Sequence, residues 1–279
     1  GLSVGDELRI LEAIERLQAL GPWRLIPTLL AAHIVPDEFV NDRAGYVRLI
    51  NEELLPEVAR RGLARHVDVF CDTGAFTVDE TLSILACGRD HGLGLKVHAE
   101  QLTHTGISGE AARLGAVSAD HLEHISDDDI ESMAAAGTCA VLVPAVALFL
   151  GLSERAPARR LMSAGVPVAL ATDCNPGSCP STHLPLVASL GCTWLGMQPH
   201  EALHGITRIA AAAVGLSDGT GTLLPGAPAD FVVCDVPGWR HIPYRLGSNP
   251  IRDIFIAGQH VLSRSYSSPG EELDVRHPH

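Results

Sequence analysis

The protein has 279 residues, of which 46% are apolar and 19% charged, so it carries enough apolar surface for one large folded domain with a small appendage. Asp and Glu outnumber Lys and Arg by 33 to 20, and the net charge of −13 argues against a nucleic-acid or anionic-membrane partner. The seven cysteines form no C-x-x-C pair, and no apolar run reaches the roughly 20 residues of a membrane span. We therefore expect reduced thiols and a cytoplasmic location.

Short apolar runs alternate with helical patterns over the first 215 residues. Following an amphipathic segment at 7–20, six β-like runs each precede a helical pattern, and these runs begin at Arg24, His66, Leu95, Ala119, Cys139 and Val166. Such nearly continuous apolar strands belong to a parallel sheet that is covered on both faces. Six strands fit an open doubly wound sheet, whereas a barrel needs eight. No G-x-G-x-x-G turn follows the first run, which weakens the dinucleotide-binding version of the open sheet.

Three local patterns make specific predictions. Residues 46–61 are predicted as one helix. Ser126 is predicted to cap a helix that starts with three consecutive aspartates, because acidic side chains favour a helix N-terminus. Residues 139–143, which open the apolar run at 139–151, are predicted as a strand that ends at Pro144.

The pattern changes after Gly215. The stretches at 221–238 and 251–262 are short β-like segments separated by Gly and Pro turns. We predict three regions: a β/α region at 1–215, a small β region at 216–265, and a polar tail at 266–279.

Histidine and aspartate residues recur where the predicted strands end. His33 follows the first strand, His98 ends the third, His121 ends the fourth, and Asp173 follows the sixth. In α/β barrels the carboxyl ends of the strands carry the chemistry. A single histidine beside an apolar run is usually structural, but four such residues in one layer favour a hydrolytic metal site. Imidazole and carboxylate suit Zn²⁺ or Fe²⁺, and a bound metal would lower the pKa of a water whose proton the aspartate takes.

Other polar residues receive weaker predictions. His183 lies near the Asp173 loop and is a candidate to support the metal ligands, whereas His66 is expected at the surface. Cys174 and Cys179 lack C-x-x-C spacing and are interpreted as packing residues. Asp72, at the end of the second strand, has no assigned role.

Seven motifs together resemble the imidazolonepropionases, a family of the amidohydrolase superfamily. They are LLAAHIVP (29–36), HVDVFCDTGAFT (66–77), LKVHAEQL (95–102), LGAVSADHLEHIS (114–126), AGVPVALATDCNPGS (164–178), PLVASLGCTWLGMQPHEAL (185–203) and GTLLPGAPADFVVCD (221–235). VHAEQ and ATDCNPGS, in that order, are specific, whereas the last block indicates only the superfamily. The resemblance implies a (β/α)8 TIM-type barrel, of which about six β/α units are present here, plus part of a small β-sandwich domain.

The resemblance also implies roles for individual residues. His98 and Asp173 match metal ligands, Asp173 also serves as general base, and His121 helps to polarise the substrate. The positions that match substrate contacts are His33, Gln101, Asn175, Gly177 and Ser178. Two further histidine ligands, in a His-x-His pair on the family's first strand, are expected upstream of Gly1, so we expect this chain to be about two-thirds of the enzyme.

The resemblance implies a metal-dependent hydrolase of cyclic amides, with zinc or iron as the metal. It would convert 4-imidazolone-5-propanoate to N-formimidoyl-L-glutamate in histidine degradation, as a homodimer with a small-molecule substrate. Two alternatives stay open at this point. One is another amidohydrolase, such as a nucleobase or imidazole deaminase, and the other is a metal-free α/β ligand-binding protein.

Overall fold

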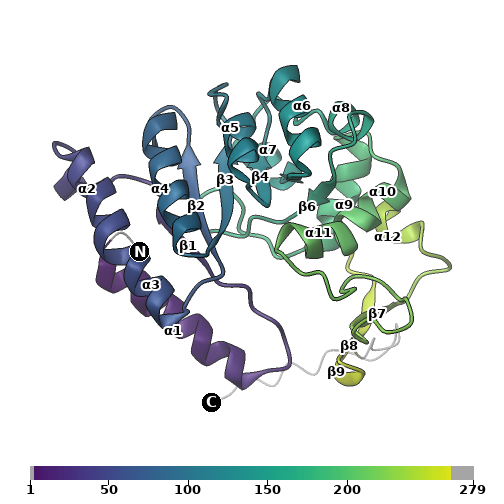
Figure 1. The fold of residues 1–279 in the computed structure, drawn as a ribbon. Helices are drawn as coiled ribbons and strands as arrows, with labels where there is room; N and C mark the ends of the chain where they lie inside the picture. Colours follow the sequence, from purple (N-terminus) through teal and green to yellow (C-terminus); the bar gives the residue numbers. More distant parts are fainter. Residues whose placement is uncertain (1–2, 265–279) are drawn as a thin grey trace, which may run out of the picture.

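The computed structural model of the protein describes residues 3–264, and a six-stranded parallel sheet lies at its centre (Figure 1). The strands are β1 (Thr28–Ala32), β2 (His66–Cys71), β3 (Gly94–Ala99), β4 (Ser118–His121), β5 (Cys139–Leu142) and β6 (Val168–Leu170). Their order across the sheet follows their order in the chain, β1-β2-β3-β4-β5-β6. A doubly wound sheet reverses its strand order at a switch point, so this topology is that of a barrel wall. The predicted six β/α units are confirmed.

The two faces of the sheet differ in polarity, because successive side chains of a strand point to opposite faces. Val67 and Val69 of β2 are buried in the main apolar core, and Leu95 and Val97 of β3 lie in the same core. Alternate residues of these strands, such as Asp68 and His98, occupy the other face. We call these the helix-covered face and the inner face.

Helices follow the strands, and most of them cover one face of the sheet (Figure 1). They are α1 (Val4–Leu20), α2 (Arg43–Leu49), α3 (Leu55–Arg61), α4 (Val78–Asp90), α5 (Ile107–Leu114), α6 (Asp127–Ala136), α7 (Pro144–Leu150), α8 (Ala158–Ser163), α9 (Leu184–Thr193), α10 (Pro199–Gly205), α11 (Arg208–Ala213) and α12 (His241–Tyr244). Helix α11 instead contacts the other face, where Ala213 packs with Cys139 and Val141. Short η1 (Asp37–Phe39) follows β1. The predicted cap of α6 is confirmed, because the Ser126 side chain accepts a hydrogen bond from the Asp129 backbone N–H.

The structure corrects one predicted segment and adds a helix after another. The helix expected at 46–61 begins at Arg43 and contains a wider π turn, η2 (Ile50–Leu54), between α2 and α3. Pro56 has no N–H to donate to the carbonyl four residues earlier. In the wider turn the N–H of Leu55, the residue before Pro56, donates to the Ile50 carbonyl instead. The strand predicted at 139–143 is confirmed as β5, and the rest of the apolar run forms helix α7, which was not predicted. Pro144 opens that helix, where a missing N–H costs nothing.

The last part of the described chain forms a separate antiparallel sheet, drawn in yellow-green below the main sheet in Figure 1. Its strands are β7 (Phe231–Cys234), β8 (Ile251–Ile256) and β9 (Gln259–Ser263), and the Phe231 and Phe255 rings stack across it at 4.5 Å. The predicted β segments are thus present. The boundary at residue 215 stays a proposal, and the predicted tail at 266–279 lies outside the described residues.

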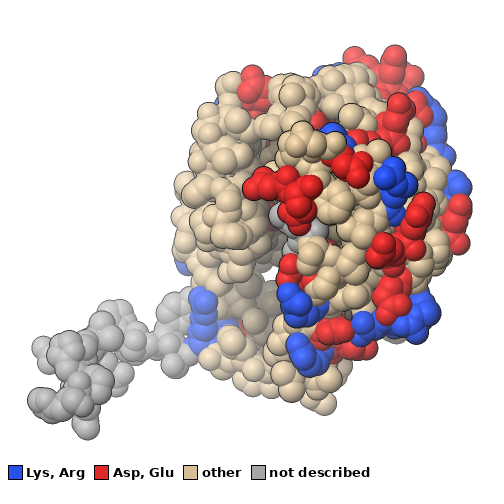
Figure 2. Space-filling view, turned by 90° about the vertical axis from the view of Figure 1, so that its left-hand side faces the viewer, with Lys and Arg blue, Asp and Glu red and all other residues tan. Residues whose placement is uncertain are grey.

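The surface and the cysteines agree with the composition. On the face in Figure 2, acidic side chains are interleaved with basic ones over the right-hand side, and much of the left is uncharged. All seven cysteines are free thiols, as predicted. None of the helices within residues 3–264 combines the length and apolar character needed to cross a bilayer.

Candidate metal and substrate site

The four residues predicted from the strand ends gather at one edge of the sheet. The His98 ring lies 6.4 Å from the His33 ring and 5.2 Å from the His121 ring, measured between centroids. Asp173, just beyond β6, interacts electrostatically with both His98 and His33. Parallel strands end at the same edge, so residues up to 140 positions apart in sequence (His33 and Asp173) meet there.

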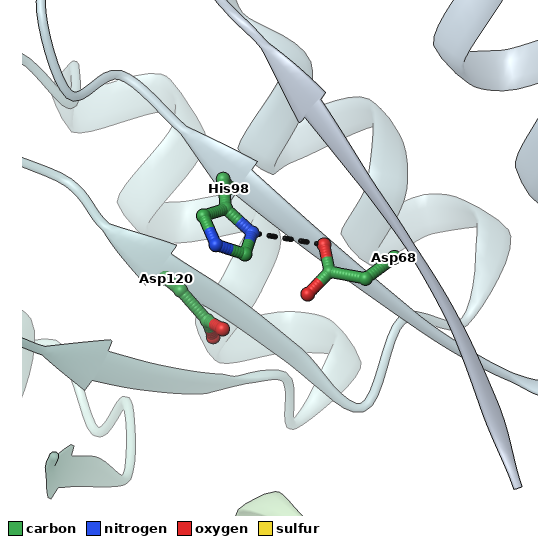
Figure 3. A group of neighbouring side chains, drawn as sticks. All are labelled: Asp68, His98 and Asp120. Carbon is green, nitrogen blue, oxygen red and sulfur yellow. Dashed lines mark hydrogen bonds and ion pairs between the residues drawn. The ribbon is translucent and has the colours of Figure 1, made fainter. Parts of the chain in front are cut away.

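His98 is held by a carboxylate that the sequence analysis did not single out. Its Nδ1 lies 3.0 Å from Oδ1 of Asp68, the inner-face neighbour on β2 (Figure 3). Burial alone would lower the pKa of His98, but the charge and hydrogen bond of Asp68, with help from Asp120 and Asp173, raise it to about 9. Burial raises the pKa of Asp68, and its interactions with His98 and Lys96 outweigh that effect and lower it. The sequence signal for Asp68 is the alternation in HVDVF, which places it two residues from Phe70 on the inner face.

His121 and His33 are neutral rings. Burial, reinforced by the charge of His98, lowers the pKa of His121 to about 3, and the same two causes lower the pKa of His33. The buried Nδ1 of His121 has no hydrogen-bond partner among the described residues. His121 also has φ +80°, a conformation that costs a non-glycine residue energy. A neutral ring with an unused nitrogen at the edge of the sheet is suited to hydrogen bonding with a ligand.

Asp173 precedes a loop that its neighbours hold in shape. Burial raises the pKa of its carboxyl, while His98 and Asn175 act in the opposite direction. The Asn175 amide oxygen accepts from the backbone N–H groups of Gly177 and Ser178 at 2.9 and 2.8 Å, and its nitrogen donates to the Asp173 carbonyl at 2.8 Å. The Asn175 side chain therefore holds the loop in shape through these hydrogen bonds. A contact between Asn175 and the substrate stays a prediction.

Asp72 gains a role from the structure. This buried carboxylate at the end of β2 accepts hydrogen bonds from the Thr73 N–H at 2.7 Å, the Leu102 N–H at 2.8 Å and the Thr103 hydroxyl at 2.6 Å. The latter two donors follow Gln101 directly in sequence. Asp72 thus ties the end of β2 to the loop after β3 that carries Gln101.

The remaining predictions, which concern two cysteines and two histidines, have different outcomes. Cys179 is buried as a packing residue, whereas Cys174 is exposed and makes no packing contribution of that kind. His183 caps α9, where its Nδ1 accepts from the Leu186 N–H at 2.9 Å. His66 was wrongly expected at the surface: it is the first residue of β2 and only 5% exposed.

Three further polar groups on the inner face were missed. Lys96 on β3, Ser118 and Asp120 on β4 form a chain in which the Lys96 ammonium donates to the Ser118 hydroxyl, and that hydroxyl donates to Asp120 at 2.7 Å. Asp120 also lies 3.8 Å from the Lys96 ammonium. The sequence signal for these residues is again an alternation with a period of two. It places Lys96 on the same face as His98, and Ser118 on the same face as Asp120, within runs that otherwise look apolar.

A parallel barrel-type sheet with imidazole and carboxylate groups at its carboxyl edge defines a class of metal-dependent hydrolases. The chain matches the Amidohydrolase family over residues 65–252 and belongs to that family. Membership implies a divalent metal ion, and Asp68, His98 and Asp120 form a cluster of groups of the kind that can hold one.

Two curated relatives illustrate the sequence similarity. The chain is 46% identical over 263 residues to the imidazolonepropionase of Geobacillus kaustophilus, covering 94% of this chain and 62% of the relative. It is 47% identical over 259 residues to that of Myxococcus xanthus, covering 93% of this chain and 61% of the relative. The chain therefore spans somewhat less than two-thirds of the length of these relatives.

Solved structures share the fold at low sequence identity. The 5-methylcytosine deaminase of Klebsiella pneumoniae, liganded with 5-fluorocytosine, matches with a TM-score of 0.75 at 16% identity, covering 95% of this chain and 70% of that one. The adenosine deaminase of Xanthomonas campestris with bound zinc matches with a TM-score of 0.70 at 18% identity, covering 91% and 64%. These likenesses show the fold alone.

Proposed function

We propose that the protein is an imidazolonepropionase, which hydrolyses the cyclic amide C–N bond of 4-imidazolone-5-propanoate to give N-formimidoyl-L-glutamate in histidine degradation. The observation that carries the proposal is the 46–47% identity to imidazolonepropionases over 93–94% of the chain. The gathering of His33, His98, His121 and Asp173 at one edge supports it.

The residues at the site fit a catalytic metal. His98 would bind through Nε2, because its Nδ1 faces Asp68, and Asp173 would add a carboxylate oxygen. A catalytic zinc usually takes three protein ligands, of which these are two, and the same donor types suit iron. When bound, such a metal lowers the pKa of a water molecule toward neutrality and polarises a carbonyl oxygen. Zinc and iron both stay within the proposal.

Asp173 is the proposed proton carrier. Burial raises the pKa of its carboxyl, which brings a proton acceptor closer to neutral pH. In the proposed reaction the oxygen of water adds to the ring carbonyl carbon and Asp173 takes the proton. The C–N bond then breaks, and Asp173 returns that proton to the leaving ring nitrogen. Atoms and charge balance without another reactant.

Neutral polar groups are proposed to hold the substrate. His121 and His33 remain uncharged near pH 7, so they would hydrogen-bond the imidazolone rather than pair with a charge. Gln101 would contact the ring from the loop anchored by Asp72. Gly177 and Ser178 belong to the loop that would enclose the rest of the substrate and the product.

The proposal extends to partners and location. A net charge of −13 supports a small-molecule substrate without nucleic acid or membrane, and seven free thiols support a cytoplasmic enzyme. We also propose a homodimer, by analogy with the family.

A turnover assay tests the proposal. The natural polypeptide that carries this chain is loaded with Zn²⁺ or Fe²⁺ and given 4-imidazolone-5-propanoate, guanine or cytosine in parallel. We expect loss of the imidazolone absorbance and formation of N-formimidoyl-L-glutamate only with the first substrate. Asp173→Asn serves as the inactive control. Ammonia release from guanine or cytosine, without reaction of the imidazolone, would contradict the proposal and indicate a deaminase.

A further inference from the structure

Two carboxylates flank His98 on the inner face, the buried Asp68 and the partly buried Asp120, and neither belongs to the predicted ligand set. Asp68, His98 and Asp120 each offer one atom, and these atoms lie within 4.8 Å of one another (Figure 3). The side chains are 5%, 15% and 15% exposed, respectively. The three groups could hold a cation between them, or the two carboxylates could each act on His98 separately.

The partners of the two carboxylates differ. Asp68 Oδ1 faces His98 Nδ1 at 3.0 Å, whereas Asp120 accepts from the Ser118 hydroxyl at 2.7 Å and lies 3.8 Å from the Lys96 ammonium. A cation placed among the three would have to approach the fixed positive charge of Lys96. The Lys96 ammonium therefore disfavours a cation among the three groups. It favours an arrangement in which Asp68 interacts with His98 and Asp120 interacts with Lys96.

In the neutral form of His98, which is the form that binds a metal, the hydrogen bond to Asp68 decides which ring nitrogen carries the proton. A carboxylate has only acceptor atoms, so the proton of this contact belongs to Nδ1. The lone pair of the neutral ring then resides on Nε2, the nitrogen that faces away from Asp68. Carboxylate partners of this kind orient metal-binding histidines and increase their basicity in other metal sites.

We propose that Asp68 is a positioning residue for His98, which fixes the ring orientation and leaves Nε2 for the metal, and that Asp120 has no such part. The statement about metal rests on the proposed function, whereas the statement about the ring proton does not. Loss of a carboxylate partner of this kind typically weakens metal binding 10- to 100-fold.

The first measurement uses the metal-free chain labelled with 15N in its histidines. We expect a downfield, slowly exchanging ring N–H proton on Nδ1 of His98 in the wild-type protein. Asp68→Ala should remove this resonance, and Asp120→Asn should keep it. Asp120→Asn is the matched control, since it changes the same residue type on the same face of β4, the strand on the other side of β3 from Asp68. A protected proton on Nε2 instead, or its survival in Asp68→Ala, overturns the proposal.

The second measurement is the affinity for Zn²⁺, determined by competition with a chelator. Asp68→Asn should weaken binding 10- to 100-fold, and Asp120→Asn should change it less than about threefold. Equal losses in both variants would assign the effect to net charge and overturn the proposal. If the wild-type protein binds neither zinc nor iron, the proposed function fails, and the ring-proton measurement still decides the role of Asp68. Circular dichroism confirms that each variant is folded.

Discussion

The two faces of the parallel sheet are built from the same strands and have opposite characters. On β3, Leu95 and Val97 pack into the helix-covered core, while the alternate residues Lys96 and His98 bond to other polar groups on the inner face. One strand thus contributes to the apolar core on one side and to the candidate site on the other. A sequence run that looks uniformly apolar can therefore contain polar side chains at every second position, all on one face of the strand.

The largest expected effect separates chemistry from folding. Asp173→Asn preserves shape and removes the proposed proton acceptor, so we expect kcat to fall at least about 10³-fold, within the range for loss of a general base. The melting temperature should change little, because Asp173 is only partly buried. Steady-state kinetics and thermal denaturation on the same sample check this. Retention of kcat within tenfold would contradict the assigned role.

The helix-covered face should show the reverse pattern. Leu95→Ala removes a side chain that is 3% exposed in the core, and we expect the free energy of unfolding to fall by about 2–5 kcal/mol. The ring proton of His98 should persist at temperatures where the variant is folded. Urea denaturation measures the loss. A loss below about 1 kcal/mol would show that the two faces are less distinct than their burial suggests.

A buried carboxyl beyond β4 gives a pH-dependent prediction. Burial raises the pKa of Glu123 from 4.5 to about 7, and its Oε2 has no hydrogen-bond partner among the described residues. The folded protein keeps this proton up to about pH 7, whereas the unfolded chain releases it near pH 4.5, so the contribution of Glu123 to stability falls as the pH rises between these values.

Glu123→Gln removes that pH dependence. We expect the variant to be more stable than the wild-type protein at pH 8, by up to about 3 kcal/mol, with little difference at pH 4.5. Denaturation of both proteins across this range measures the difference. An unchanged difference between pH 4.5 and pH 8 would contradict the pKa shift.

The smallest expected effect concerns the loop after β3, which Asp72 ties to the end of β2 at the carboxyl edge. Asp72→Asn weakens the hydrogen bonds to the Leu102 N–H and the Thr103 hydroxyl, and we expect a loss of about 1–2 kcal/mol in stability. Because Gln101 would shift, KM should rise more than kcat falls. Thr103→Val, which removes one donor, should produce a smaller change in the same direction. A fall in kcat alone would indicate a direct part in the reaction.

Much of the site could be predicted from local sequence. His33, His98, His121 and Asp173 each stand at or just beyond the end of a predicted strand, and parallel topology is enough to bring them together. The role of Asp72 was not predictable, because its partners lie about 30 residues away in another loop. Asp68 was overlooked for a similar reason: its partner is on the neighbouring strand.

The sequence by itself determined the strand and helix alternation, the cap at Ser126 and the residues that end each strand, because these follow from local periodicity and capping chemistry. It could not choose between a doubly wound sheet and a barrel wall, since both use the same β/α units. Only the tertiary structure decided that choice, through strand order, and paired Asp68 with His98 and Asp120 with Lys96. Strand register sets those contacts, and register is a property of the assembled sheet.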